Sequence, residues 1–169
     1  MSRDNQLAAT TRVARSRPKP STRSSRAGLL GLAVTLVTSL SLADPTPTGV
    51  LSVHVANLRS NNGQVGCTIY GSSRGFPTDS SAALQRLWCP IASATSACRF
   101  DSLPAGTYAV ACFHDENANG KLDTGLFGIP TEGTVASNQA KGFMGPPSFE
   151  KAKFAFSGTA SELQLRMGY

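Results

Sequence analysis

Apolar and polar residues alternate along several short segments of the chain, and this alternation predicts strands. In the segment 50–58, Leu51, Val53 and Val55 fall on one face and His54 falls on the opposite, polar face. A period of two residues is typical of a half-buried strand, with the polar face in solvent. Further short strands are expected at 65–69, 88–91, 97–100, 107–113, 154–156 and 163–167.

Turn-forming residues separate these segments. Asn61-Asn62-Gly63 indicates a hairpin, because Asn-Gly adopts the positive φ angles of tight turns. Thr78 or Asp79 is suited to cap a short helix over residues 82–87. The turn at 103–106 precedes the most apolar strand. About seven short strands with almost no helix and no internal repeat predict an all-β fold, an antiparallel sandwich.

The periodicity disappears between Gly125 and Ser148. This segment is rich in Gly and Pro, and it carries Phe127, Ile129, Phe143 and Met144. So many apolar side chains are unfavourable in water. We therefore expect the segment to pack over the core.

Positive charge is confined to the first part of the chain. The formal net charge is +6, and residues 1–43 hold seven Arg or Lys against the single carboxylate of Asp4. Residues 44–169 hold nine basic and nine acidic side chains. A basic surface is what attracts phosphate, so the neutral remainder predicts no nucleic-acid partner.

The first 43 residues have the layout of a secretory signal peptide. A basic start is followed by an uncharged segment from Ala27 to Ala43, which ends in the small-x-small site Ser41-Leu42-Ala43. The apolar stretch is short for a membrane span, although an uncleaved signal anchor is an alternative. We expect a signal peptide at 1–43, a spacer at 44–49 and one β-sandwich domain at 50–169. The location is then periplasmic or secreted, with no stable membrane anchor after cleavage.

Four cysteines lie in the expected mature part: Cys67, Cys89, Cys98 and Cys112. An even number in an exported chain predicts two disulfide bonds. Three pairings are possible, and the spacings do not choose among them.

The stretch from His114 to Asp123 has the composition of a metal-binding loop. Asp115, Asn117 and Asn119 occupy positions 1, 3 and 5, a glycine follows at position 6, and Asp123 stands at position 9. Oxygen ligands at alternate positions wrap Ca²⁺ in loops of the EF-hand type. The backbone carbonyl of Lys121 at position 7 is a further ligand candidate.

The match to an EF-hand is incomplete, because position 12 is Leu126 and the flanking helices are missing. Glu116 and Glu132 are candidates for the last carboxylate. We predict a Ca²⁺ site of about 10⁻⁴–10⁻³ M affinity at best. A turn in which Asx side chains bond their own backbone is an alternative, and so is a transition-metal site that uses His114.

No arrangement of residues indicates a catalytic site. The chain has two histidines and no Gly-x-Ser-x-Gly elbow, which argues against a hydrolase of that type. We therefore assign no catalytic residue and no cofactor other than Ca²⁺.

Five motifs in order carry a resemblance to a known family. They are Leu103-Pro-Ala-Gly-Thr-Tyr-Ala-Val110, the stretch 114–123, Gly128-Ile-Pro-Thr-Glu-Gly133, Ser137-Asn138 and Gly145-Pro-Pro-Ser-Phe149. The chain resembles the bacterial exported proteins of the domain of unknown function 2141 family from about residue 50 to 156. The resemblance implies export and a small sandwich, prealbumin-like or carboxypeptidase-regulatory-like, and it implies no activity.

The resemblance also implies a pairing of the cysteines. It suggests Cys67 with Cys98 and then Cys89 with Cys112, with a local Cys89–Cys98 bridge as the alternative. It further suggests one surface built from the acidic loop and the segment 128–147, with Glu132 or Asn138 near the loop.

We expect an exported binding or envelope-associated module of unknown activity, without catalysis, that uses the loop at 114–123 for Ca²⁺. Its partner would be a protein, a glycan or a small ligand. One alternative is a metal-dependent hydrolase or carbohydrate-active enzyme that uses His114, Asp115 and Glu132. Another is a carrier that holds a small ligand under Phe127 and Phe143.

Overall fold

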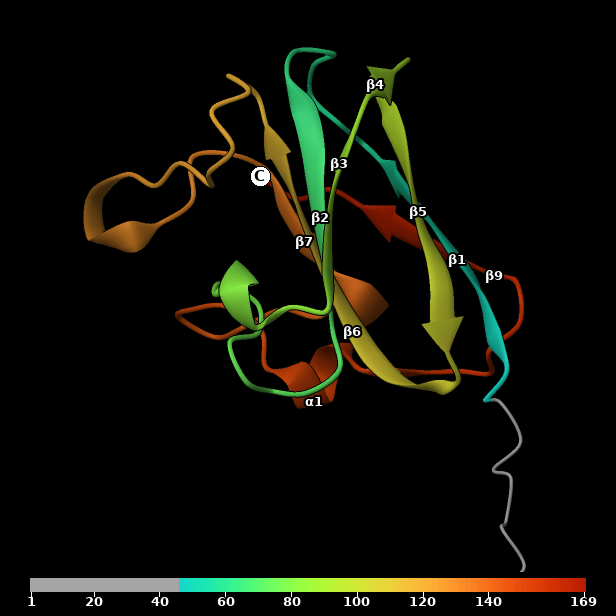
Figure 1. Cartoon of the computed structure of the whole chain (residues 1–169). Coiled ribbons are helices and arrows are strands. Elements are labelled where there is room, and N and C mark those ends of the chain that lie inside the picture. Colours follow the sequence, from blue (N-terminus) through green and yellow to red (C-terminus); the bar gives the residue numbers. More distant parts are fainter. Residues whose placement is uncertain (1–45) are drawn as a thin grey trace, which may run out of the picture. The chain divides into compact units, whose positions relative to one another are not determined.

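Two β-sheets form the domain (Figure 1). The computed structural model of the chain describes residues 46–169. The signal peptide and cleavage site expected at 1–43 lie outside the described residues.

The first sheet has the strand order β4-β5-β1-β9. β1 (Thr48–Ala56) lies between β5 (Thr95–Pro104), to which it is antiparallel, and β9 (Ser161–Arg166), to which it is parallel. β4 (Ile91–Ala92) extends the other side of β5. The central strand therefore has one partner from the middle of the chain and one from its last residues.

The second sheet has the order β3-β2-β6-β7. β3 (Gln85–Cys89), β2 (Gln64–Tyr70), β6 (Gly106–Asp115) and β7 (Thr134–Ala136) are antiparallel neighbours. β8 (Phe154–Phe156) pairs with the start of β6. The predicted all-β sandwich is confirmed, with nine strands and one parallel pair in the described residues.

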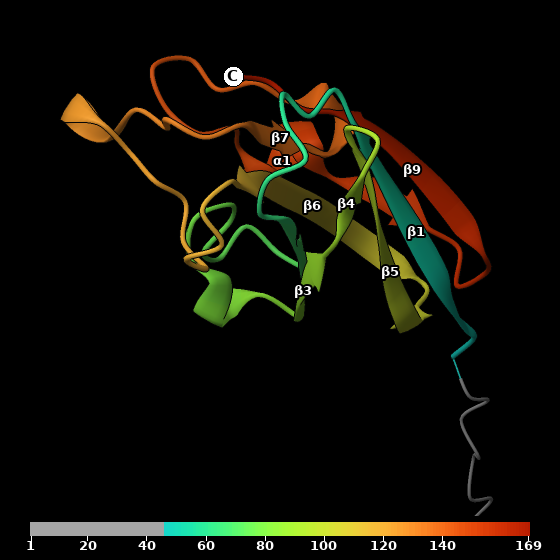
Figure 2. The ribbon, with the colours of Figure 1, turned by 90° about the horizontal axis from the view of Figure 1, so that it is seen from above.

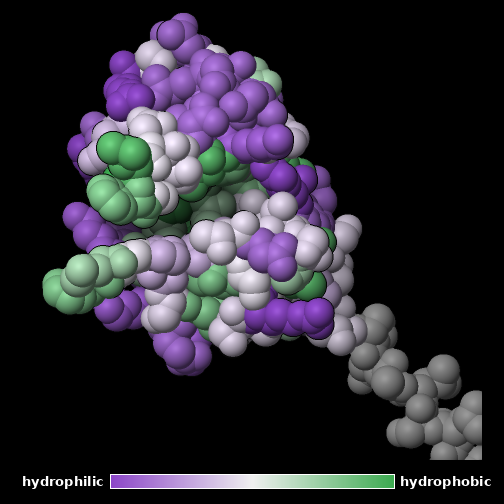
Figure 3. Space-filling model, turned by 90° about the vertical axis from the view of Figure 1, so that its left-hand side faces the viewer, coloured by the Kyte–Doolittle hydropathy of each residue, from purple (hydrophilic) through white to green (hydrophobic). Residues whose placement is uncertain are grey.

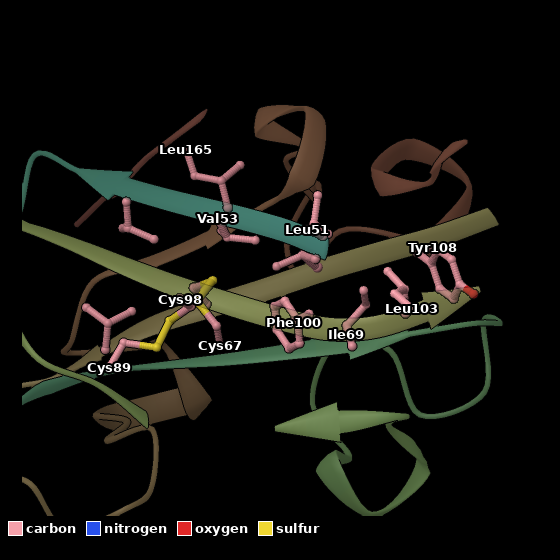
Figure 4. Close-up of a cluster of buried hydrophobic side chains, with 14 of the residues drawn as sticks. Leu51, Val53, Cys67, Ile69, Cys89, Cys98, Phe100, Leu103, Tyr108 and Leu165 are labelled. Atoms are coloured by element: carbon pink, nitrogen blue, oxygen red, sulfur yellow. A yellow bond between two sulfur atoms is a disulfide. The ribbon is translucent and has the colours of Figure 1, made fainter. Parts of the chain in front are cut away.

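The core lies between the two sheets, as Figure 4 shows. The alternation in β1 behaves as predicted, because Leu51, Val53 and Val55 are buried while His54 is not. Each sheet contributes one face of each strand to this layer. The largest fully buried apolar side chains are Phe100, Leu51, Ile69, Leu103, Leu165, Met167, Val53, Val55, Val65, Val110 and Tyr70.

The second sheet is also covered on part of its outer face. Tyr70 of β2 packs there in a cluster with Phe149 from the short helix α1 (Phe149–Ala152). Phe76 lies edge-to-face against both aromatic rings. This small third layer buries Tyr70 at the end of β2, and the rings of Trp88 and Phe113 cover Gly66 on the same strand. Figure 2 shows the two sheets from above.

The disulfide pairing implied by the resemblance is wrong. Cys67 bonds Cys112, and Cys89 bonds Cys98. The register of the β2–β6 pair places Cys67 directly opposite Cys112, with their Cα atoms 4.1 Å apart. That separation is typical of a non-hydrogen-bonded cross-strand pair.

The second disulfide joins the two sheets. Cys89 ends β3 in the second sheet, and Cys98 lies in β5 of the first sheet. The local bridge considered as the alternative is therefore formed, and it connects the two layers of the sandwich (Figure 4).

The helix expected over residues 82–87 is wrong. A single 3₁₀ turn, η1 (Ser80–Ala82), begins after Asp79, which accepts a bond from the Ser81 backbone N–H as a cap. Leu87 of the following residues pairs with Cys67 in β2. Leu87 and Cys89 face the core while Arg86 and Trp88 face outward. Pairing with β2 therefore determines the conformation of this segment, whose local sequence pattern is weak.

The hairpin expected at Asn61-Asn62-Gly63 is wrong as well, because β1 and β2 lie in different sheets. The positive φ did occur, at Gly63 (70°). A Cβ at this position would lie 1.9 Å from the Asp115 carbonyl oxygen. Gly63 therefore turns the chain from one sheet to the other and lets it pass directly over the start of the acidic loop.

The expectation that the segment 125–148 packs over the core is wrong for its apolar residues. Phe127, Ile129, Phe143 and Met144 are exposed. What the segment buries is Glu132 and the residues around β7 and η3 (Ser137–Gln139), including Ala136 and Ser137. The part around β7 is held by strand pairing and by apolar contacts of Val135 and Ala136, whereas the buried Glu132 is the polar contact of the part that precedes it.

Among the described residues no helix combines the length and apolar character needed to cross a bilayer.

The two disulfides give the first prediction. Non-reducing digestion and mass spectrometry should find the peptides Cys67–Cys112 and Cys89–Cys98. Replacing the first pair by alanine should cost about 4 kcal/mol and the second about 3 kcal/mol, because the first closes the longer loop. Urea unfolding of the two double variants measures which disulfide contributes more to the free energy of unfolding. A Cys67–Cys98 peptide would contradict the strand register.

Candidate functional site

The acidic loop begins where β6 ends, at Asp115. This side chain is fully buried. Its Oδ1 accepts the backbone N–H of Asn119 at 3.0 Å, and its Oδ2 accepts that of Gly120 at 2.9 Å. Gln64 of β2 donates a third bond to Oδ2 at 2.9 Å. Asp115 therefore folds the loop back onto the end of its own strand.

The other alternating residues of the loop meet at Asp123. The side-chain amide of Asn117 donates to Asp123 Oδ2 at 2.7 Å, and that of Asn119 donates to Oδ1 at 3.0 Å. The side-chain oxygens of the two asparagines accept the N–H groups of Asn119 and Lys121. The structure thus brings the predicted positions 3, 5 and 9 together.

Lys121 and Leu126 contribute differently. Lys121 is exposed, and its backbone N–H bonds Asn119. Leu126, at the position of the EF-hand glutamate, is exposed and lies in the 3₁₀ turn η2 (Leu126–Gly128). A cation in the loop would therefore have to take its last carboxylate from another residue.

Glu132 supplies a buried carboxylate beside the loop. Its Oε1 accepts the backbone N–H of Glu116, and its Oε2 accepts that of Asp123, both at 2.9 Å. The two bonds clamp the beginning and the end of the loop. The expectation that Glu132 lies near the acidic loop agrees with this geometry.

Asn138 does not lie near the loop. Its side-chain amide faces the backbone carbonyls of Lys151, Ala152 and Lys153 at the end of α1, with the shortest contact, 2.9 Å, to Lys153. The neighbouring Ser137 hydroxyl donates to the Ala152 carbonyl at 2.6 Å. The Ser137-Asn138 motif therefore fastens α1, and the idea of one shared surface holds for Glu132 only.

His114 is enclosed beneath the loop. It is fully buried, its Nε2 lies 2.9 Å from the Asn62 carbonyl oxygen, and its Nδ1 lies 2.7 Å from the Tyr169 hydroxyl. A carbonyl can only accept, so Nε2 carries the proton and, in the neutral ring, Nδ1 accepts from the tyrosine. Both ring nitrogens of His114 are therefore engaged in hydrogen bonds in this structure.

Arg59 and Tyr169 are site residues that sequence reasoning missed. Arg59 Nη2 lies 2.6 Å from Glu116 Oε1 and donates to the Thr131 carbonyl at 3.1 Å. Its guanidinium lies over the Tyr169 ring at 4.5 Å. The carboxylate of Glu116 raises the pKa of Arg59. No local pattern marks these residues, because their partners lie far away in the sequence.

Two carboxylates of the site form no ion pair in the described residues. Within residues 46–169 no Lys or Arg nitrogen lies at ion-pair distance from Asp115 or Glu132. Both rely on N–H donors instead. Three or more His, Cys, Asp or Glu side chains do not gather around one point in this part of the chain, so the donors of a cation here must include amide and carbonyl oxygens.

One family model matches residues 53–164, and its description is an uncharacterized protein conserved in bacteria, DUF2141. The chain belongs to the DUF2141 family. The match includes the acidic loop, Glu132 and both disulfides of this DUF2141 domain. No curated protein and no solved structure matches the chain.

The Glu132 clamp gives a second prediction. Glu132→Gln should lower the free energy of unfolding by about 1–3 kcal/mol, because one backbone N–H then faces a side-chain NH₂ group. Amide hydrogen exchange should accelerate at Glu116 and Asp123. Glu162→Gln, an exposed change on β9, is the matched control. Equal exchange in both variants would contradict the clamp.

Tyr169 gives a third prediction. Burial raises the pKa of its phenol, so its contribution to stability should be complete below the ordinary pKa and lost as pH rises through the raised value. Tyr169→Phe should cost about 1–3 kcal/mol at neutral pH, because it leaves a buried His114 nitrogen without a donor. Urea unfolding at neutral and alkaline pH measures both effects. A variant with unchanged stability at neutral pH would rule out this role.

Proposed function

We propose that this DUF2141 domain is an exported, envelope-associated binding module that binds Ca²⁺ through the loop at 114–123. The observation that carries the proposal is the meeting of Asn117, Asn119 and Asp123. The side-chain amides of Asn117 and Asn119 lie 2.7 and 3.0 Å from the two oxygens of the Asp123 carboxylate. Each group carries an oxygen of the hard type that Ca²⁺ prefers.

The loop is suited to exchange its internal bonds for a cation. Asp123 now takes its donors from the NH₂ groups of the two asparagines. Rotation of these amides would turn their oxygens toward the carboxylate, so the same three side chains could surround a positive ion. The carbonyl of Lys121 and the carboxylate of Asp115 are the further ligand candidates.

Charge supports the same proposal. Buried carboxylates are usually paired with a cation or bound to a metal, and Asp115 forms no ion pair with Lys or Arg in the described residues. Ca²⁺ beside Asp115 would supply that charge. Glu132 acts on the backbone of the loop and would preserve its shape, and Glu116 is held by Arg59.

Export rests on the N-terminal pattern of the sequence and on the two disulfides. Such bonds persist in oxidising compartments, which supports a periplasmic or secreted location. The lack of a free nitrogen on His114 favours binding over catalysis.

The Ca²⁺ proposal gives a fourth prediction. Thermal unfolding of the oxidised chain should shift upward by about 4–7 °C at a Ca²⁺ concentration ten times the Kd, since this adds about 1.4 kcal/mol. Mg²⁺ should shift it less, because the ion demands a near-ideal octahedron. The reference is the chain in EDTA.

Asp123→Asn is the informative variant. This side chain is partly exposed, and its carboxylate accepts the side-chain amides of Asn117 and Asn119, so the fold should tolerate the change. The Ca²⁺ shift should disappear. Asp101→Asn, an exposed carboxylate on β5, should keep it. No Ca²⁺ shift in the parent chain would refute the metal site and leave the loop as a structural turn.

A further inference from the structure

Two loop tips of the domain display large apolar side chains to solvent. The first tip carries Leu126, Phe127 and Ile129, and the second carries Phe143 and Met144. The exposed fractions are 97% for Phe127, 90% for Phe143 and 93% for Met144. Exposed apolar groups of this size in one region mark an interaction surface.

Short-range backbone contacts close both tips. In the first, the Gly125 N–H donates to the Ile129 carbonyl at 2.8 Å, and Thr124 pairs with Pro130. In the second, a Cβ on Gly142 would lie 1.9 Å from the Gly145 carbonyl oxygen. The chain is therefore pinched at the base of each tip.

Positive φ angles occur at the ends of both tips, at Phe127 (61°) and Met144 (54°). Side chains other than glycine adopt this conformation at a cost. At these two positions the backbone turns while the side chains remain in solvent. The apolar side chains are therefore exposed by the conformation of the two turns.

The two tips project from the same side of the domain. The segments at 125–130 and 140–147 both lie at the left of Figure 1 and again at the left of Figure 2. Figure 3 looks onto this side and shows apolar surface gathered on two projections with a hollow between them. A surface that contacts both tips must therefore approach from this side.

Exposed lysine side chains lie beside both tips. Lys121 precedes the first tip, Lys141 precedes the second, and both are exposed. Among the nearby carboxylates, Asp123 accepts the amides of the acidic loop, Glu132 is buried, and the exposed Glu150 pairs with Lys153. Exposed ammonium groups beside apolar projections complement a surface of anionic headgroups above hydrocarbon.

We propose that the two tips dock this domain reversibly on the interface of an anionic lipid bilayer. Lipid chains rearrange around separate convex projections, whereas a protein partner would need a shaped pocket for each. Phenylalanine, leucine and methionine would enter the acyl boundary while the lysines stay among the headgroups. The inference rests on the proposed envelope association, and it does not depend on Ca²⁺.

A reporter at the tip tests insertion directly. The chain has one tryptophan, Trp88, so Phe127→Trp is combined with Trp88→Phe. On vesicles of phosphatidylethanolamine and phosphatidylglycerol, the emission should shift to the blue and be quenched by brominated lipid. Arg99→Trp in the same background is the control, because residue 99 lies on β5 of the other sheet. No quenching at position 127 would overturn the proposal.

Vesicle flotation gives an independent readout with Trp88 intact. Phe127→Ser with Phe143→Ser should lower the partition coefficient by about tenfold or more, without changing the melting temperature, because both side chains are exposed. Lys121→Glu with Lys141→Glu should weaken binding to anionic vesicles, and Arg166→Glu on β9 should not. All chains carry the same residues 1–45, so that segment cancels in the comparison.

The outcomes separate this inference from the Ca²⁺ proposal. Tip-dependent flotation in EDTA supports membrane docking even if Ca²⁺ leaves the melting temperature unchanged. A Ca²⁺ shift with flotation that the tip variants do not alter supports the metal site and overturns the docking. Concentration-dependent dimerisation through the tips without flotation also overturns it, in favour of contact between two copies.

Discussion

The pairing of β2 with β6 fixes the position of everything else in the site. Cys67 and Cys112 are bonded directly across this pair. The bond holds the register, and a slip by one residue would turn the core side chains of the strand to the other face. In that register Val65 lies opposite His114 and Gln64 lies opposite Asp115. The carboxylate that folds the acidic loop is thus held from a strand that starts fifty-one positions earlier.

Polar bonds, and not apolar packing, then determine the shape of the region beyond β6. Asp115 and Glu132 together accept five N–H donors. Three of them donate to Asp115 and two donate to Glu132. Because these carboxylates satisfy the backbone internally, the turn that follows needs no apolar residue to hold it. Leu126, Phe127 and Ile129 are left at the surface.

The strand pattern was predictable because it depends on local alternation, and the β1 core residues behave as expected. The turn at Gly63 was predictable in its dihedral angle but not in its direction, since an Asn-Gly turn does not state whether the next strand pairs with the previous one. The disulfides could not be assigned, because opposition of Cys67 and Cys112 exists only once the register is known. Arg59 and Tyr169 were beyond reach for the same reason. The spacing of the Asp and Asn residues marked the acidic loop. The two backbone bonds of Glu132 could not be predicted, because they depend on how residues 116, 123 and 132 come together in the fold.

The parallel pairing of β1 with β9 has a consequence for the order in which the molecule is completed. Asn57 bonds the carbonyl of Met167, 110 positions later, so the central strand of the first sheet lacks one neighbour until the final segment arrives. Contacts of such long separation slow folding. A chain of this topology is therefore expected to stay unfolded for longer than one built from successive hairpins.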